Sequence, residues 1–274
     1  MRGTVDTCRA CSKEAPYKFS GPLLGRTVNY FECASCSYLQ TEQPTWLDEA
    51  YASPINICDT GILARNVLNT RRVGSFCLLI GKKNARIVDF AGGHGIQVRM
   101  LRDAGFDARW SDKFCENLFA RGFEHRDESA DIVTAFEAFE HFVVPGAELA
   151  RMLEVAPTVL FSTLLLPDPI PRPGTWWYYG EEHGQHVGLY QQRTLERLAA
   201  NHSARFYTNG FDLHVITKEP KTINFRNLSV MTRLWPLIKR LWLKPMTYSD
   251  HAFLVSQYAP TALKSVQIST VRRD

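Results

Sequence analysis

A short apolar segment that ends in an acid and a glycine turn constrains the fold of this chain more than any other feature. Residues 86–95 read RIVDFAGGHG, which predicts a buried strand followed by a turn. Residues 96–104 then place apolar side chains at helical spacing before Gly105, which predicts a helix with a glycine stop. Glycines let the backbone pass close to a ligand, and the free amides of a helix start can receive it. The segment therefore predicts a ligand-binding strand, turn and helix.

A second acid follows the next predicted strand. Residues 106–112 read FDARWSD, so that Asp112 ends this strand 17 residues after Gly95. An acid at this place in a strand-helix-strand unit can accept hydrogen bonds from ribose hydroxyls. The turn departs from the dinucleotide pattern G-x-G-x-x-G, because Asp89 precedes the glycines. This order favours a ligand with an amino group.

A third segment, residues 131–141, reads DIVTAFEAFEH and predicts a strand whose carboxyl end lies at the ligand-binding edge of the sheet. Together the three segments resemble the class I S-adenosylmethionine-dependent methyltransferases over roughly residues 80–215. The chain departs from that family at Ala91, where glycine is usual. The resemblance implies an α/β fold with a Rossmann-like, seven-stranded methyltransferase sheet.

The resemblance also implies S-adenosylmethionine as the cofactor. We expect Asp89 to hold the amino-acid end of the cofactor, directly or through water, and Asp112 to hold the ribose. Loop 124–129 marks out no residue for the adenine. The residues expected to bind the cofactor are Asp89, Ala91, Gly92, Gly93, Gly95, Asp112, Phe136 and Glu137.

Four of the seven cysteines form two C-x-x-C pairs that are separated by 21 residues. Four thiolates close a tetrahedral zinc shell and leave no open position for chemistry, so the pairs predict a structural zinc site. Residues 17–31 between them alternate in polarity, as in a hairpin, and complete a small zinc-ribbon-like module. Coincidence or redox thiols are the alternative. The expected zinc ligands are Cys8, Cys11, Cys33 and Cys36.

The segment at residues 176–190 reads WWYYGEEHGQHVGLY, which is too polar for an ordinary core strand. In the family that the chain resembles, this segment lines the acceptor pocket, and aromatic faces stack well on sugar rings. A base is needed for an oxygen or carbon acceptor. His186 and His183 are the first candidates, and His141 with Glu140 is the second. The alternative is an aromatic plug with hydrogen-bonded histidines.

Glu137, Glu140 and His141 also have a spacing that could hold a divalent ion. Some methyltransferases with a similar E-x-x-E-H segment bind such an ion, and many others use the segment to shape the pocket floor. Both interpretations stay open at the level of sequence.

We predict four parts in the chain. Residues 46–80 form a helical linker or lid, in which Arg65 and Asn66 either face the cofactor or lie on a solvated helix face. The C-terminal extension is basic and amphipathic, which suits a packed helix, a second subunit or an anionic membrane surface. The parts are the zinc-binding module (1–45), the linker (46–80), the S-adenosylmethionine-binding domain (81–218) and the C-terminal extension (219–274).

The C-x-x-C pairs joined to this domain resemble zinc-containing sugar methyltransferases of bacterial surface-polysaccharide pathways, so a sugar or polysaccharide-linked acceptor is expected. A lipid or quinone-like acceptor and a non-catalytic scaffold are the alternatives. Net charge +4 does not by itself imply nucleic acid, and the sequence contains neither an N/D-P-P-Y-like segment nor a broad basic face, so we expect no nucleic-acid substrate. No apolar run reaches the length of about 20 residues that spans a membrane, and no signal peptide is recognisable. We expect a cytoplasmic protein, with contact to the inner membrane face through the extension as an option and the oligomeric state open.

Overall fold

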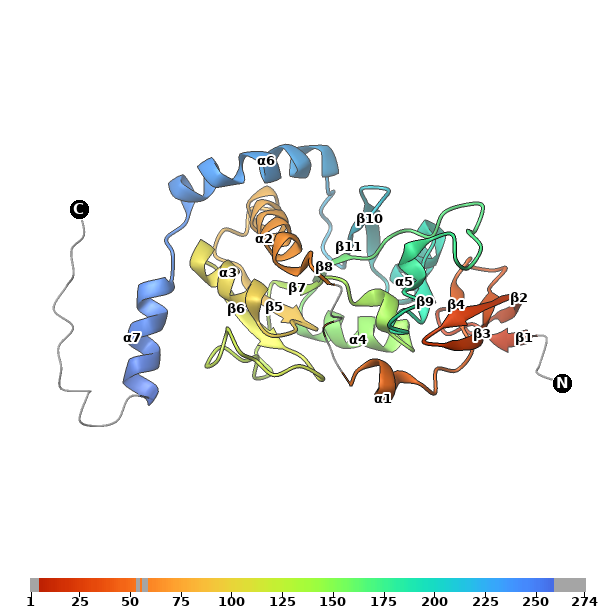
Figure 1. The fold of residues 1–274 in the computed structure, drawn as a ribbon. Coiled ribbons are helices and arrows are strands. Elements are labelled where there is room, and N and C mark those ends of the chain that lie inside the picture. Colours follow the sequence, from red (N-terminus) through yellow and green to blue (C-terminus); the bar gives the residue numbers. More distant parts are fainter. Residues whose placement is uncertain (1–4, 53–54, 56–58, 259–274) are drawn as a thin grey trace.

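The computed structural model describes residues 5–52, 55 and 59–258 of the 274-residue chain, and these residues form two β-sheets (Figure 1). The central sheet has the strand order β10-β11-β8-β7-β5-β6. β5, β6, β7 and β8 run parallel, whereas β10 and β11 are antiparallel additions at one edge. The strands are β5 (Arg86–Phe90), β6 (Asp107–Ser111), β7 (Ile132–Ala135), β8 (Thr158–Ser162), β10 (Arg205–Thr208) and β11 (Leu213–Thr217).

Helices cover both faces of the central sheet, because its inner strands are apolar on both sides. Ile87 belongs to the core that packs against α2, α3 and α6, and its neighbour Val88 belongs to the core under α4 and α5. This arrangement confirms the predicted α/β methyltransferase fold. The helices are α2 (Ile62–Leu79), α3 (Ile96–Ala104), α4 (Pro145–Val155), α5 (Gln192–Asn201) and α6 (Phe225–Trp242).

The central sheet has six strands in the described part of the chain, where seven were predicted. The sequence also suggests a very short strand at Phe123, but the chain there forms only an isolated bridge between Trp110 and Glu124. Residues 205–217 are expected from the sequence to form an antiparallel hairpin around Asn209, and β10 and β11 confirm it.

The sequence of residues 114–121 also suits a helix on the face of the sheet, but this expectation is wrong, because the segment is a loop. Its amides are captured by groups outside the segment. Asp112 Oδ1 accepts hydrogen bonds from the amides of Phe114 and Cys115, at 2.7 and 2.8 Å. Farther along the loop, the amides of residues 118 and 119 donate to the carbonyl of His94, so no helical ladder forms.

The second sheet carries the cysteine pairs and has the order β1-β2-β3-β4-β9 (Figure 1). The hairpin predicted between the pairs is formed by β2 and β3. Strand β9 comes from the segment that contains the two predicted catalytic histidines, so this sheet includes a strand from the distant half of the chain. The strands are β1 (Val5–Thr7), β2 (Glu14–Leu23), β3 (Arg26–Glu32), β4 (Leu39–Thr41) and β9 (Gly188–Leu189).

Short elements complete the fold. Helix α1 (Leu47–Ala50) joins the N-terminal sheet to α2, and two 3-10 turns, η1 (Phe139–His141) and η2 (Trp177–Tyr179), follow β7 and β8. After α6, helix α7 (Thr247–Tyr258) is fixed to α3 by Asp250, which pairs with Arg99 and Arg102. None of the helices in the described residues has the length and apolar character needed to cross a membrane.

Candidate active site

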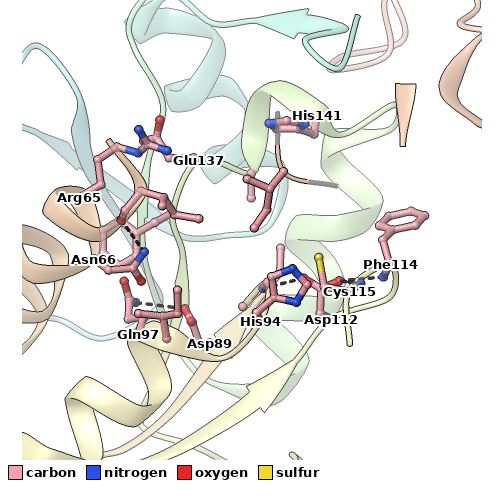
Figure 2. A pocket seen from close by; sticks show the side chains of 18 of the residues that line it. Arg65, Asn66, Asp89, His94, Gln97, Asp112, Phe114, Cys115, Glu137 and His141 are labelled. Atoms are coloured by element: carbon pink, nitrogen blue, oxygen red, sulfur yellow. Dashed lines mark hydrogen bonds between the residues drawn. The ribbon is translucent and has the colours of Figure 1, made fainter. Parts of the chain in front are cut away.

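A cavity of about 270 Å³ lies at the carboxyl ends of β5, β6 and β7, with α2 on its opposite side (Figure 2). Ligands of open parallel sheets bind at this edge. Below we call it the cofactor cavity. Arg65 and Asn66, for which the sequence left open a position facing the cofactor or a solvated helix face, also line it. Its walls contain seven of the residues predicted to bind the cofactor: Asp89, Ala91, Gly92, Gly93, Asp112, Phe136 and Glu137.

The glycine turn has a left-handed backbone at three positions, with φ of 60° at Ala91, 53° at Gly93 and 86° at Gly95. A β-carbon at Gly95 would lie 2.7 Å from Asn117 Oδ1, so this glycine makes room for the neighbouring loop and does not line the cavity. A β-carbon at Gly93 would meet no protein atom within 4 Å, because the residue faces open space. Ala91 adopts a conformation that costs a non-glycine residue about 1 kcal/mol, which explains why glycine is usual there.

Asp89 is buried at the floor of the cofactor cavity. Its Oδ1 accepts hydrogen bonds from Thr134 Oγ1 at 2.6 Å and from Gln97 Nε2 at 3.1 Å. Burial raises the pKa of Asp89 to about 7, and the Asp112 charge adds to this rise, while the Thr134 hydroxyl opposes it. A cationic group bound beside Asp89 would favour its ionised form.

Asp112 organises the turn and the loop that follows it. Its Oδ2 accepts a hydrogen bond from the Gly93 amide at 2.9 Å, and its Oδ1 accepts those from Phe114 and Cys115. An ionised carboxylate has about four acceptor sites, so these three bonds leave capacity for a ligand hydroxyl.

Aromatic side chains cover the cofactor cavity from the N-terminal side. Tyr51 stacks on Phe114 with ring centroids 4.9 Å apart and planes 6° apart. The Tyr51 hydroxyl and His141 Nδ1 are hydrogen-bonded at 3.0 Å. Sequence reasoning assigned neither aromatic residue to the site. Phe114 lies two residues after Asp112, which was the only signal for it, and Tyr51 lies in the predicted linker, away from every motif.

A second cavity, of about 610 Å³, adjoins the first and is called the acceptor-side cavity below. All four residues predicted to be catalytic line it: His186, His183, His141 and Glu140. Trp177 also lines it and is 75% exposed, so one indole face is free for stacking. The residues that both cavities share are Asp59, Arg65, Glu137, His141 and Gln185.

The hydrogen bonds of the histidines define their tautomers. His186 Nδ1 lies 2.6 Å from the Tyr178 carbonyl, which can only accept, so Nδ1 carries the proton and Nε2 carries the lone pair. His183 Nδ1 accepts a hydrogen bond from the Gln185 amide at 3.1 Å, so neutral His183 carries its proton on Nε2. Burial lowers the pKa of both rings, that of His186 to about 3.

Glu140 is the most unusual group of the acceptor-side cavity. It is completely buried, and neither carboxylate oxygen forms a hydrogen bond of good geometry in the described part of the chain, while Oε1 lies 4.0 Å from His141 Nε2. Burial raises its pKa to about 8, and the Glu137 charge adds to this rise, whereas the nearby Tyr178 and Thr163 hydroxyls oppose it. Such a group requires a proton, a cation or a ligand donor as a partner.

The group of residues that could hold a metal ion here differs from the predicted one. Ligand atoms of Glu140, His141 and His186 lie within 4.8 Å of one another, so His186 takes the place expected for Glu137. Glu137 has a left-handed backbone, with φ of 51°, and its Oε1 accepts a hydrogen bond from Ser162 Oγ at 2.5 Å. This bond holds the carboxylate away from the group.

The four N-terminal cysteines come together as predicted. All four sulfur atoms lie within 4.8 Å of one another, with 3.6 Å between Cys8 and Cys36 and 3.5 Å between Cys11 and Cys33. A zinc tetrahedron with bonds of about 2.3 Å has sulfur–sulfur edges of about 3.8 Å, so the set fits this ion. The module is tied to the acceptor side at Val187, whose carbonyl accepts from Arg9 Nη2 at 2.7 Å and whose amide donates to the Glu140 carbonyl at 2.9 Å.

Comparisons with known proteins agree with this geometry. Residues 63–203, more than half of the chain, match the family described as a methyltransferase domain. No curated protein sequence matches the chain.

Solved structures with a similar fold include TnmH, which is 18% identical with a TM-score of 0.42 over 65% of this chain and 62% of TnmH. This chain therefore spans less than two thirds of TnmH. Magnesium protoporphyrin IX methyltransferase (ChlM) from Synechocystis PCC 6803 with bound SAH is 13% identical, with a TM-score of 0.45 over 63% of this chain and 93% of that chain. The plantazolicin methyltransferase BpumL in complex with a monoazolic desmethylPZN analog and SAH is also 13% identical, with a TM-score of 0.45 over 70% of this chain and 87% of that chain. At these values the structures say nothing about the acceptor of this chain.

Proposed function

Since the chain belongs to the methyltransferase domain family, we propose that it methylates a sugar or a polysaccharide-linked acceptor with S-adenosylmethionine. The observation that carries the proposal is the pair of adjoining cavities. One has acids at strand ends and a glycine turn, and the other has an exposed indole and neutral histidines.

The residues of the cofactor cavity fit S-adenosylmethionine. Asp89 would hold the ammonium group, which compensates the raised pKa of its buried carboxyl. Asp112 would accept a ribose hydroxyl with its remaining capacity, while Gly93 leaves space for the ligand. When bound, the cofactor supplies an electrophilic methyl group on a sulfonium. The protein then has to align the acceptor with it and exclude water, which are the main tasks in such a displacement.

On the acceptor side, His186 is the proposed base. Its Nδ1 proton is held by the Tyr178 carbonyl, so Nε2 offers a lone pair toward the group formed with Glu140 and His141. The proton taken from the acceptor would reside on Nε2. Because its raised pKa leaves Glu140 protonated at neutral pH, Glu140 would stabilise the resulting imidazolium only after losing its own proton. His183 carries its proton on Nε2 and is suited to donate a hydrogen bond to the acceptor. Trp177 would stack on a sugar ring.

Two measurements test the proposal separately. S-adenosylmethionine should raise the melting temperature of the purified protein, and Asp112→Ala should weaken its binding by about 10- to 100-fold, the range for lost ligand and turn hydrogen bonds. A screen of nucleotide sugars and glycans with labelled cofactor should then identify the acceptor by methyl uptake. A wild-type protein that the cofactor does not stabilise would remove the enzymatic proposal, whereas stabilisation without uptake by any carbohydrate would remove only the acceptor class.

A lipid or quinone-like acceptor is the second candidate, and one observation favours it. Apolar side chains on α6 are exposed, as described below, which suits a protein that works at a membrane surface. Labelled methyl uptake into a lipid extract, with none into glycans, would select this candidate.

We also propose that the four cysteines hold one structural zinc ion. Elemental analysis should find one zinc per chain, and Cys8→Ser should lose it together with the cooperative unfolding of the N-terminal sheet. A second metal ion per chain, lost in Glu140→Gln but kept in Cys8→Ser, would assign an ion to the group of Glu140, His141 and His186. Activity unchanged after EDTA has removed all non-zinc metal would exclude a role for such an ion.

A further inference from the structure

Helix α6 exposes an apolar stripe on the surface of the molecule. Val230, Leu234, Leu237 and Leu241 follow one another at spacings of four, three and four residues, so they lie on one side of the helix. Their exposed fractions are 50%, 47%, 65% and 83%. We call these four residues the α6 stripe.

The opposite side of α6 packs into the hydrophobic core, so the stripe is not the side by which the helix packs on its own domain. Leu228 and Trp235 are buried in the core shared with α2 and α3. A β-carbon at Gly74 of α2 would lie 2.1 Å from the Trp235 ring, and Phe106 stacks on the same ring with centroids 6.3 Å apart. Helix α6 therefore packs against α2 (Figure 1), and the exposed fractions of the stripe residues place them on the solvent side of α6.

A row of arginines accompanies the stripe. Arg226, Arg233 and Arg240 recur every seven residues, which places them on one line of the helix, next to the apolar residues. Helix α6 contains no acidic residue, and Lys239 and Lys244 add positive charge at its C-terminal end. In the part of the chain that the structure describes, none of these cations forms an ion pair.

We propose that the α6 stripe and its arginine row dock the protein on an anionic phospholipid surface. An amphipathic helix of this kind lies in the interface plane, with its apolar side in the acyl boundary and its cations among the anionic headgroups. Charge decides between a bilayer and a second copy of this chain. A symmetric contact between two copies would repeat the same cations around the stripe, without a carboxylate of α6 to neutralise them. A bilayer supplies the missing negative charge.

The docked surface lies one helix away from the catalytic region. The first turns of α2 line the cofactor cavity, and Trp235 of α6 packs against α2 farther along, at Gly74. Docking would thus hold the enzyme at a membrane without covering the residues that line the cavity. The proposal does not depend on the identity of the acceptor or on methyl transfer.

Vesicle flotation with the full-length protein tests the proposal. Vesicles of phosphatidylcholine alone are compared with vesicles in which about a third of the lipid is phosphatidylglycerol, at low and at high salt. The wild type should float with the anionic vesicles at low salt and remain unbound on the neutral ones. The double variant Leu237→Gln, Leu241→Gln should lower partitioning at least tenfold. In the double variant Arg233→Gln, Arg240→Gln, each lost cation should lower partitioning onto the anionic vesicles about fivefold.

Two matched controls carry the same changes elsewhere. Phe211→Gln removes an exposed apolar side chain from the β10–β11 turn, and Arg197→Gln removes an exposed cation from α5. Both should float like the wild type, and all variants should keep the wild-type melting temperature, since the changed residues are exposed. The proposal is overturned if the wild type stays unbound on anionic vesicles at low salt, or if the controls lose as much binding as the α6 variants. A dimer that the leucine variant dissociates, without vesicle binding by the wild type, would instead assign the stripe to a second copy.

Discussion

The two adjoining cavities are built in different ways. In the cofactor cavity, the acids at the strand ends already have partners: Asp112 binds three backbone amides, and Asp89 binds a hydroxyl and an amide. In the acceptor-side cavity, Glu140 forms no hydrogen bond of good geometry among the described residues, and His186 keeps a free Nε2 lone pair. A buried polar group without a partner is costly, so it indicates a place where a ligand or a proton completes the site. The side chains of the first cavity are thus held in place by the protein itself, whereas the second contains groups that a ligand or a proton would complete.

The largest expected effect separates the two cavities by function. His186→Ala should lower kcat by about a thousandfold, the usual contribution of a general base, because it removes the free lone pair. Its S-adenosylmethionine affinity should stay at the wild-type value. His183→Ala is the matched control and should lose less than tenfold, since His183 Nδ1 already accepts from the Gln185 amide. Equal losses in both variants, measured as initial rates at saturating cofactor, would contradict the assignment of the base.

In the cofactor cavity, the buried carboxyl of Asp89 should make the stability of the protein depend on pH. Burial raises the pKa of folded Asp89 from 3.8 to about 7, so the folded protein binds a proton that the unfolded chain has lost over this pH range. Stability should therefore fall as the pH rises from about 4 to about 7, by on the order of 4 kcal/mol for this group. Asp89→Asn should lack this loss and melt higher than the wild type at pH 8. S-adenosylmethionine should stabilise the wild type more than the variant, and melting curves without any pH-dependent difference would refute the explanation.

A smaller effect is expected from closing the open space at Gly93. Gly93→Ala places a methyl group in the cofactor cavity without a protein clash and should weaken cofactor binding about tenfold, while the left-handed backbone costs about 1 kcal/mol of stability. Gly81→Ala is the matched control. Gly81 has φ of 76° and the same open surroundings, but it lies outside both cavities. Its variant should therefore lose the same about 1 kcal/mol of stability and bind the cofactor as tightly as the wild type. Calorimetric titration would decide, and equal affinities in the two variants would mean that the ligand does not approach Gly93.

The smallest effect is expected at Ala91. Ala91→Gly removes the strain of the left-handed backbone at this alanine, but it also increases the conformational entropy of the unfolded chain. The free energy of unfolding should therefore rise by no more than about 0.5 kcal/mol. Urea unfolding would measure this difference, with unchanged cofactor affinity as the second expectation. A large gain or loss of affinity would show that the Ala91 side chain contacts the ligand.

Sequence reasoning succeeded where the relevant contacts are local. The strand, turn and helix from Arg86 to Ala104 and the acid Asp112 were predicted because glycines, acids and apolar spacing encode them within a few residues of one another. The cysteine cluster was predicted for the same reason. These features define the α/β core and most of the cofactor cavity.

The predictions failed where distant segments meet. Residues 114–121 suggested a helix, but no helix forms, because Asp112 and His94 accept hydrogen bonds from the amides that a helix needs. The apolar side chains of Phe114, Leu118 and Phe119 are exposed in the resulting loop. The bond between Glu137 and Ser162 joins the ends of two strands, and the pair formed by Tyr51 and His141 spans 90 positions. No pattern within a single segment encodes such pairings.

The hydrogen bonds at Val187 connect the cysteine module to the backbone beside His186 and Glu140. Val187 is the neighbour of His186, and it is held both by Arg9, which lies inside the first cysteine pair, and by the Glu140 backbone. At the next residue, Gly188, a β-carbon would lie 1.8 Å from the Tyr38 hydroxyl, so the backbone here is tightly packed against the module. We infer that the module sets the alignment of the proposed base His186 and of Glu140. If the cysteines hold the proposed zinc, its loss should lower turnover before it affects cofactor binding, and changes in the module could alter acceptor choice without altering the glycine turn.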